Sequence, residues 1–84
     1  MSKLELASRR ALVTGGTKGI GAAVVEALLE QGARVLGVSR GAVDIQRENL
    51  DFISADLSTE EGCLATVQAV LEKVGGIDIL VNVV

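Results

Sequence analysis

Thr14-Gly15-Gly16-Thr17-Lys18-Gly19-Ile20-Gly21 is a glycine-rich octet, and the expected topology of the chain is built around it. Before it, the apolar run Ala11-Leu12-Val13 is typical of a buried strand. After it, Ile20, Val24 and Leu28 recur at helical spacing. The first turn of a helix offers free N–H donors and the positive end of the helix dipole, and glycine lets an anion approach the backbone. A strand, a glycine turn and a helix in this order therefore predict a phosphate-binding turn.

The spacing of the glycines separates the known phosphate-binding motifs. Glycines at positions 15, 16, 19 and 21 do not match G-x-G-x-x-G, and a P-loop fails because Ala22 and Ala23 replace its Lys and Ser/Thr. The pattern T-G-x-x-x-G-x-G does fit, and in it the chain resembles the short-chain dehydrogenase/reductase family. A glycine turn without a ligand stays the alternative. The resemblance implies the following coenzyme-binding residues: Gly15, Thr17, Lys18, Gly19, Ile20 and Gly21.

Composition limits the class of protein. The chain has 84 residues, 49% of them hydrophobic, which suits one α/β unit. The resemblance implies that residues 1–84 are the N-terminal part of a Rossmann dinucleotide-binding domain, truncated before the catalytic region. A net charge of −3 without a basic cluster argues against nucleic acid as a partner. One cysteine and no histidine leave no disulfide and no zinc set, and Cys63 is expected in the core. Because no apolar run could cross a membrane and no signal peptide is evident, we expect a cytoplasmic protein.

Four apolar stretches predict parallel strands, and two helical patterns connect them. A helix over Gly19–Gln31 should end at Gly32 in the left-handed conformation, and residues 41–50 predict a short helix or an irregular crossover. The sheet should be Rossmann-type and doubly wound, in the order 3-2-1-4, with a crevice between its first and fourth strands. An uncovered fourth strand leaves a hydrophobic edge, so we expect a fragment or a homo-oligomer. The predicted strands are Arg9–Thr14, Val35–Ser39, Leu50–Ala55 and Ile77–Val84.

The second helix has its own start and stop signals. Ser58 and Glu61 form a capping box, in which Ser58 caps the helix and Glu61 reaches back. Gly75-Gly76 stops the helix. Its apolar positions fall on one helical face: Leu64, Val67, Leu71 and Val74.

The residues after the second strand predict the coenzyme. In doubly wound folds an acidic residue at this place pairs with the ribose hydroxyls of NAD. Here the chain has Ser39 and Arg40, so no acid repels a 2′-phosphate and Arg40 can bind one bidentately. Lys18 contacts the same phosphate in similar family members. We therefore expect NADP rather than NAD, with ordinary solvated cations as the alternative.

The family resemblance extends to two further strand ends. Asp56 and Leu57 resemble an Asp-Leu pair whose carboxylate accepts from the adenine amino group, although Asp56 could also simply favour the following helix N-terminus. Asn82 aligns with the first residue of an Asn-Asn-Ala-Gly motif at the nicotinamide end, from which Val83-Val84 depart. The Thr14 hydroxyl can tie the turn to neighbouring backbone, and a plain strand residue is the alternative.

The chemistry of the family needs residues that this sequence lacks. Hydride transfer there uses a Ser, a Tyr and a Lys, and this chain contains no Tyr, so we assign no catalytic residue. We expect the NADP(H)-binding portion of a short-chain oxidoreductase that exchanges hydride with a small carbonyl or alcohol substrate. The alternatives are a non-catalytic dinucleotide-binding or sensor module and a fragment that assembles through its open sheet edge. A methyltransferase is disfavoured, because it would want an acid after the second strand.

Overall fold

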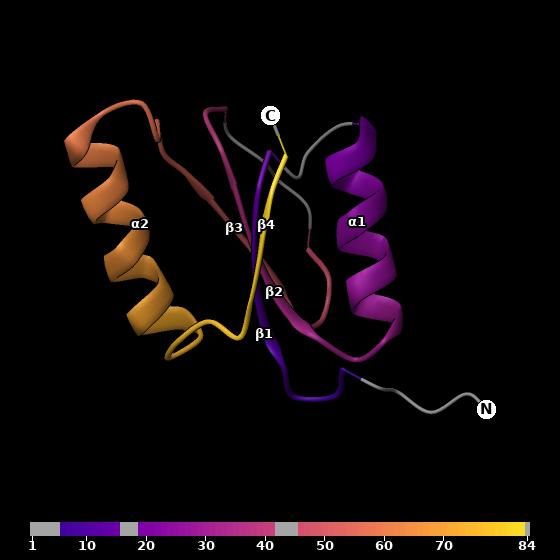
Figure 1. Cartoon of the computed structure of the whole chain (residues 1–84). Coiled ribbons are helices and arrows are strands. Elements are labelled where there is room, and N and C mark those ends of the chain that lie inside the picture. The colour runs from indigo at the N-terminus through magenta and orange to yellow at the C-terminus, as the bar shows by residue number, and fades with distance from the viewer. Residues whose placement is uncertain (1–5, 16–18, 42–45, 84) are drawn as a thin grey trace.

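A computed structural model describes residues 6–15, 19–41 and 46–83 of the chain. A parallel sheet forms the middle layer, and the two helices lie on its opposite faces (Figure 1). The four predicted strands and the two predicted connecting helices are present, with ends that differ from the prediction by no more than a few residues. The elements are β1 (Arg10–Thr14), α1 (Gly19–Glu30), β2 (Arg34–Ser39), β3 (Leu50–Ser54), α2 (Glu60–Lys73) and β4 (Ile79–Asn82).

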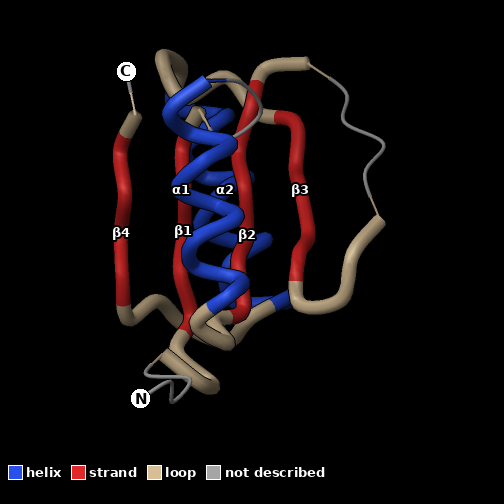
Figure 2. Tube along the Cα trace, turned by 90° about the vertical axis from the view of Figure 1, so that its right-hand side faces the viewer, coloured by secondary structure: helices blue, strands red, loops and turns tan. Residues whose placement is uncertain are grey.

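The sheet is four-stranded in the order β3-β2-β1-β4, as predicted, and all its pairs are parallel (Figure 2). Thr14 at the end of β1 is opposite Val38 on β2 and Asn82 on β4. Ser39 at the end of β2 is opposite Ser54 at the end of β3. The register therefore brings all four carboxyl ends to one edge of the sheet, where doubly wound folds bind their ligands.

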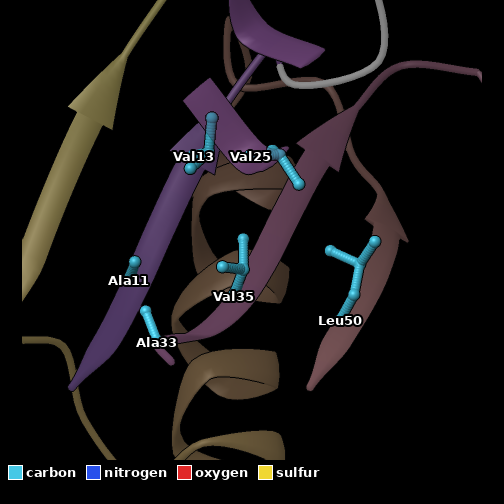
Figure 3. Packing of buried hydrophobic residues seen from close by; sticks show 6 residues of the cluster. All are labelled: Ala11, Val13, Val25, Ala33, Val35 and Leu50. Atoms are coloured by element: carbon cyan, nitrogen blue, oxygen red, sulfur yellow. The ribbon is translucent and has the colours of Figure 1, made fainter. Parts of the chain in front are cut away.

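The main core lies between the sheet and α1, which lies over β1 and β2 (Figure 2), and Figure 3 shows its buried side chains. Alternate residues of the strands face the helix, as period-2 geometry requires. Leu36 and Val38, in the middle of β2, are also fully buried, so β2 is apolar on both of its faces. The buried cluster consists of Ala11, Val13, Val25, Ala33, Val35 and Leu50.

The end of α1 confirms the predicted glycine cap. Gly32 has φ +88°, a left-handed conformation that costs glycine little. Its N–H donates to the Leu29 carbonyl at 3.0 Å, and the Ala33 N–H donates to the Leu28 carbonyl at 3.0 Å. These bonds satisfy carbonyls that the helix end would otherwise leave unpaired.

The start of α2 corrects one prediction. Thr59, not Ser58, is the N-cap, and its hydroxyl oxygen accepts from the Gly62 N–H at 3.0 Å. Ser58 is held back in the preceding turn because both its N–H and its hydroxyl donate to the Asp56 carboxylate. The helix consequently begins one residue later than the capping box predicts, and Glu61 lies in its first turn without the predicted role.

The packing of α2 corrects a second prediction. The expected apolar face is turned away from the sheet, with Leu64, Val67 and Leu71 exposed by 63%, 56% and 64%. Small and β-branched side chains face the sheet instead, because they let the helix approach the strands closely. These buried residues are Gly62, Thr66 and Val70.

Two side chains of α2, Thr66 and Cys63, donate hydrogen bonds to nearby backbone carbonyls. The Thr66 hydroxyl is buried but donates to the Gly62 carbonyl at 2.9 Å, so it carries no unsatisfied polar atom. Cys63 is exposed, contrary to the predicted core position, and it is not one of the residues on the buried face of α2. Its thiol donates to the Leu57 carbonyl at 3.3 Å.

An ion pair joins the amino ends of β1 and β4. The Arg10 guanidinium donates through Nε to Asp78 Oδ2 at 3.0 Å and through Nη2 to Oδ1 at 3.2 Å. The Arg10 N–H also donates to Asp78 Oδ2 at 2.8 Å, and the Asp78 N–H donates to the Arg10 carbonyl at 2.8 Å. These contacts lower the pKa of Asp78 to about 2. They fix the register of β4, which pairs on one side only within the described sheet.

The crossover between β2 and β3 is irregular where the structure describes it. Of the short helix or irregular crossover predicted over residues 41–50, residues 42–45 lie outside the described residues. Arg47 forms an antiparallel bridge with Leu50, and Asn49 adopts φ +66° in the turn between them. Arg47 also pairs with Glu26 on α1, which ties the crossover to the helix. No helix in the described part of the chain is long and apolar enough to cross a membrane.

Candidate functional site

The predicted site residues gather at the carboxyl edge of the sheet. Gly15 follows β1, Ser39 ends β2, Asp56 follows β3 and Asn82 ends β4. Parallel pairing of these strands brings the four positions to one edge. Thr17 and Lys18 were also predicted to contribute, and both lie outside the described residues.

Gly15 is the position where the backbone most clearly requires glycine. Its φ is +77°, and its N–H donates to the Val38 carbonyl at 2.9 Å. A Cβ at this residue would lie 2.6 Å from the carbonyl oxygen of Val83. The Val83 N–H in turn donates to the Thr14 carbonyl at 3.1 Å, so the backbone of Val83 is fixed against the end of β1. The first turn after β1 is therefore closed against the backbone that follows β4.

The start of α1 has the features of an anion site. Gly19 has φ +55°, and no atom of the described residues beyond its chain neighbours and its own helix lies within 4 Å of a built Cβ, so the space on that side is open. Gly21 is buried, whereas Ile20 is 74% exposed although it is apolar. The first turn contains no acidic residue, so its positive dipole end is not neutralised locally. The first turn can therefore offer N–H donors to a diphosphate.

Thr14 and Asn82 are linked across β1 and β4. The Thr14 hydroxyl donates to the Asn82 side-chain oxygen at 2.5 Å. The predicted partner of Thr14 was neighbouring backbone, and that prediction is wrong, because β4 brings a better acceptor directly opposite it. The bond fixes the Asn82 side chain at the carboxyl edge.

Ser39 and Arg40 are held by contacts with β3. The Ser39 carbonyl accepts from the Ala55 N–H at 2.8 Å, and the Arg40 carbonyl accepts from the Ser54 hydroxyl at 3.1 Å. The Ser39 hydroxyl donates to the Gly41 carbonyl at 2.8 Å. Arg40 is exposed, and no described carboxylate lies within ion-pair distance of its guanidinium. The backbone of Arg40 is thus anchored while its side chain is available to an external anion.

Asp56 is the most strongly organised carboxylate of this edge. Its Oδ1 accepts from the Ser58 hydroxyl at 2.6 Å and from the Ser58 N–H at 2.9 Å. These bonds, with a smaller contribution from the positive charge of Arg40, lower the pKa of Asp56. Leu57 beside it is 37% exposed. Ser58 was predicted only as a helix cap, although the Asp-x-Ser spacing is a known turn signal.

No group of three His, Cys, Asp or Glu side chains is placed to hold a metal ion within residues 6–15, 19–41 and 46–83. The polar groups of this edge are instead backbone N–H groups and a guanidinium, which donate, and side-chain oxygens, of which those of Asp56 and Asn82 accept. Together with the glycine turn, this donor set suits an organic anion that carries both phosphate and hydrogen-bonding groups.

Comparison with known proteins decides the family. A family model described as short chain dehydrogenase matches residues 9–84. This chain belongs to the short chain dehydrogenase family. An L-xylulose reductase from Bos taurus is 49% identical over an alignment of 84 positions, which covers 94% of this chain and 33% of that protein. The 3-oxoacyl-[acyl-carrier-protein] reductase FabG from Vibrio cholerae is 34% identical over 85 residues, 94% of this chain and 35% of that protein.

Solved structures agree with this assignment. The Pseudomonas aeruginosa RhlG/NADP active-site complex has a TM-score of 0.79 and 38% identity, and the match covers 95% of this chain and 34% of that one. A short chain dehydrogenase from Leptospira borgpetersenii with bound NAD+ has a TM-score of 0.81 and 28% identity, with 93% and 32% covered. The predicted family and the Rossmann-type fold are confirmed, and the family is one of oxidoreductases. The chain spans about a third of the length of the curated short chain dehydrogenases that it matches.

Proposed function

We propose that this chain is the NADP(H)-binding portion of a short-chain oxidoreductase and forms one part, residues 1–84, of a Rossmann dinucleotide-binding domain. The glycine turn carries the proposal. The space beside Gly19 is open towards the described residues outside its own helix, and the first turn of α1 contains no acidic residue. Such a turn lets a diphosphate reach the backbone N–H groups.

The coenzyme would then lie along the carboxyl edge of the sheet. Its diphosphate would lie over the start of α1, its adenine beside Asp56 and Leu57, and its nicotinamide towards Asn82. This order follows the positions of the strand ends, since β3 and β4 are the outer strands of the described sheet. The proposed contacts to the diphosphate and its flanking groups are Gly15, Thr17, Lys18, Gly19, Ile20 and Gly21.

Arg40 would select the coenzyme. It is exposed at the end of β2, with its backbone anchored by Ser54 and without a described carboxylate partner. A guanidinium can bind a 2′-phosphate through two parallel hydrogen bonds, whereas Ser39 offers no negative charge to repel it. We therefore propose NADP(H) over NAD(H).

The bound nicotinamide would supply hydride exchange with a small carbonyl or alcohol substrate. The residues of this chain would bind and orient the coenzyme for that exchange. Acid–base catalysis is assigned to none of them, because the printed sequence has no Tyr and no His. We also propose that the protein works as a homo-oligomer in the cytoplasm and has neither nucleic acid nor membrane as a partner.

Coenzyme selection can be tested by comparing Arg40→Ala with Arg34→Ala in the protein. Arg34 is a matched control, because it begins the same strand at the opposite edge, where its Nη2 lies 3.5 Å from Asp51 Oδ2. The chain contains no Trp and no Tyr, so the fluorescence of NADPH and NADH can be titrated without protein aromatic signal from these residues.

We expect Arg40→Ala to raise the Kd for NADPH about tenfold to hundredfold, since a hydrogen bond to a charged group contributes about 1.5–3 kcal/mol. The Kd for NADH should change by less than about twofold, and Arg34→Ala should alter neither value by more than that. Equal losses for both coenzymes in Arg40→Ala, or no loss at all, would show that Arg40 does not select NADP(H).

A further inference from the structure

The two oxygens of the Asp56 carboxylate have different surroundings. Oδ1 accepts two hydrogen bonds, both from Ser58, through its hydroxyl at 2.6 Å and its N–H at 2.9 Å. Oδ2 accepts none from the described residues. A carboxylate held on one side in this way has a fixed plane and one free acceptor.

We propose that Ser58 is a positioning residue for the purine end of the coenzyme, because it orients Asp56 so that Oδ2 accepts from a 6-amino group. The inference rests on the proposed function, in which adenine lies beside Asp56. It adds a residue that touches no part of the coenzyme itself, and it defines the purine class that the site accepts.

The physical reason lies in the freedom of the carboxylate. The terminal torsion of an aspartate side chain has a broad, shallow energy profile, so an unrestrained carboxylate samples many orientations. The two bonds from Ser58 remove most of this freedom before a ligand arrives, which lowers the entropic cost of binding.

The charge of Asp56 determines which purines the site would favour. Hydrogen bonds from Ser58 lower the pKa of Asp56, so the group is ionised at neutral pH and can only accept hydrogen bonds. An amino group at position 6 of a purine donates to it. A carbonyl oxygen at the same position has no proton to donate, so the carboxylate would repel it.

The backbone of Asp56 is held separately from its side chain. Its carbonyl accepts from the Thr59 hydroxyl at 2.9 Å and from the Thr59 N–H at 3.2 Å. Loss of the Ser58 hydroxyl should therefore leave the carboxylate with only the bond from the Ser58 N–H and loosen it without moving the turn. Thr59→Ala removes the helix cap and the hydroxyl bond to the Asp56 carbonyl, but it leaves the Thr59 N–H bond to that carbonyl and both carboxylate bonds in place. Thr59→Ala is thus a matched control for stability.

The experiment compares the Kd for NADPH with the Kd for its hypoxanthine analogue, which has a carbonyl at position 6. The wild-type protein should prefer NADPH about tenfold to hundredfold, as expected for one hydrogen bond to a charged acceptor. Ser58→Ala should lower this preference by about threefold or more, and Ser58→Thr, which keeps a hydroxyl, should restore it. Thr59→Ala should lower the melting temperature and leave the preference unchanged.

Each contrary result identifies what has failed. An unchanged preference in Ser58→Ala, with the preference lost in Asp56→Ala, overturns the role of Ser58 and leaves the proposed function intact. Tight binding of NADPH without any preference in the wild type overturns the inference and the adenine contact of Asp56. If neither coenzyme binds, the proposed function itself fails, and the inference fails with it.

Discussion

Gly62 provides a test of how closely α2 approaches the end of β3. The residue is buried in the first turn of the helix, against the peptide group of Asp56. A Cβ built on Gly62 would overlap the Asp56 carbonyl oxygen and lie 2.6 Å from its carbonyl carbon. We expect Gly62→Ala to destabilise the protein although alanine is the better helix former.

Two effects of known size compete in this substitution. Helix propensity alone would make alanine more stable by about 1 kcal/mol. Carbon atoms prefer separations near 3.5 Å or more, so the start of α2 would have to retreat by about 1 Å from the Asp56 peptide. Overpacking costs about 1–3 kcal/mol, and the upper end applies here because the obstacle is backbone and not a mobile side chain. The net loss in the free energy of unfolding should be about 2 kcal/mol.

Urea unfolding followed by far-ultraviolet circular dichroism measures this difference. Ala65→Gly is the control, because Ala65 lies on the exposed side of the same helix and its change isolates helix propensity, with an expected loss of about 1 kcal/mol. If Gly62→Ala were instead more stable than wild type by about 1 kcal/mol, α2 would not lie against Asp56 as described.

Two further substitutions test the strand ends. Gly15→Ala should weaken NADPH binding about tenfold or more in fluorescence titration, because φ +77° strains alanine and its Cβ would lie 2.6 Å from the Val83 carbonyl oxygen. Unchanged affinity would contradict the closed turn. Asp78→Asn should lower the melting temperature above about pH 4, and this difference should shrink as the pH falls and vanish well below about pH 2. The sign follows because Arg10 depresses the pKa of Asp78 to about 2 from 3.8, so the stabilisation needs the ionised form; a difference that does not shrink between about pH 4 and about pH 2 would contradict it.

The sheet order could be predicted because local signals and chain connectivity determine it. Apolar runs too short for helices marked the strands, and the glycine octet and Gly32 bounded the first helix. Parallel strands joined by crossover helices leave few topologies, and the observed order is the doubly wound one.

The face of α2 could not be predicted from periodicity alone. Helical spacing shows that Leu64, Val67 and Leu71 share a side, but it does not show which side meets the sheet. Gly62 lies on the buried side because the start of the helix comes too close to the Asp56 peptide for any side chain, and Thr66 and Val70 lie on the same side.

Contacts between distant residues were also missed. Arg10 and Asp78 are separated by 68 positions, and their pairing follows from the register of β1 and β4, which the sequence does not state. The bond from Thr14 to Asn82 depends on the same register. Ser58 was misassigned because two adjacent hydroxyl residues could both cap α2, and the Asp56 carboxylate captures the first of them.

Amide chemical shifts measured during NADPH titration test directly whether the start of α1 binds the coenzyme diphosphate. Saturable shifts of the Gly19, Ile20 and Gly21 amides are predicted, because their N–H groups open the helix. The amides of Arg34 and Asp78, at the opposite edge of the sheet, should not move. Shifts confined to that opposite edge, or no shifts at saturating NADPH, would contradict the assignment.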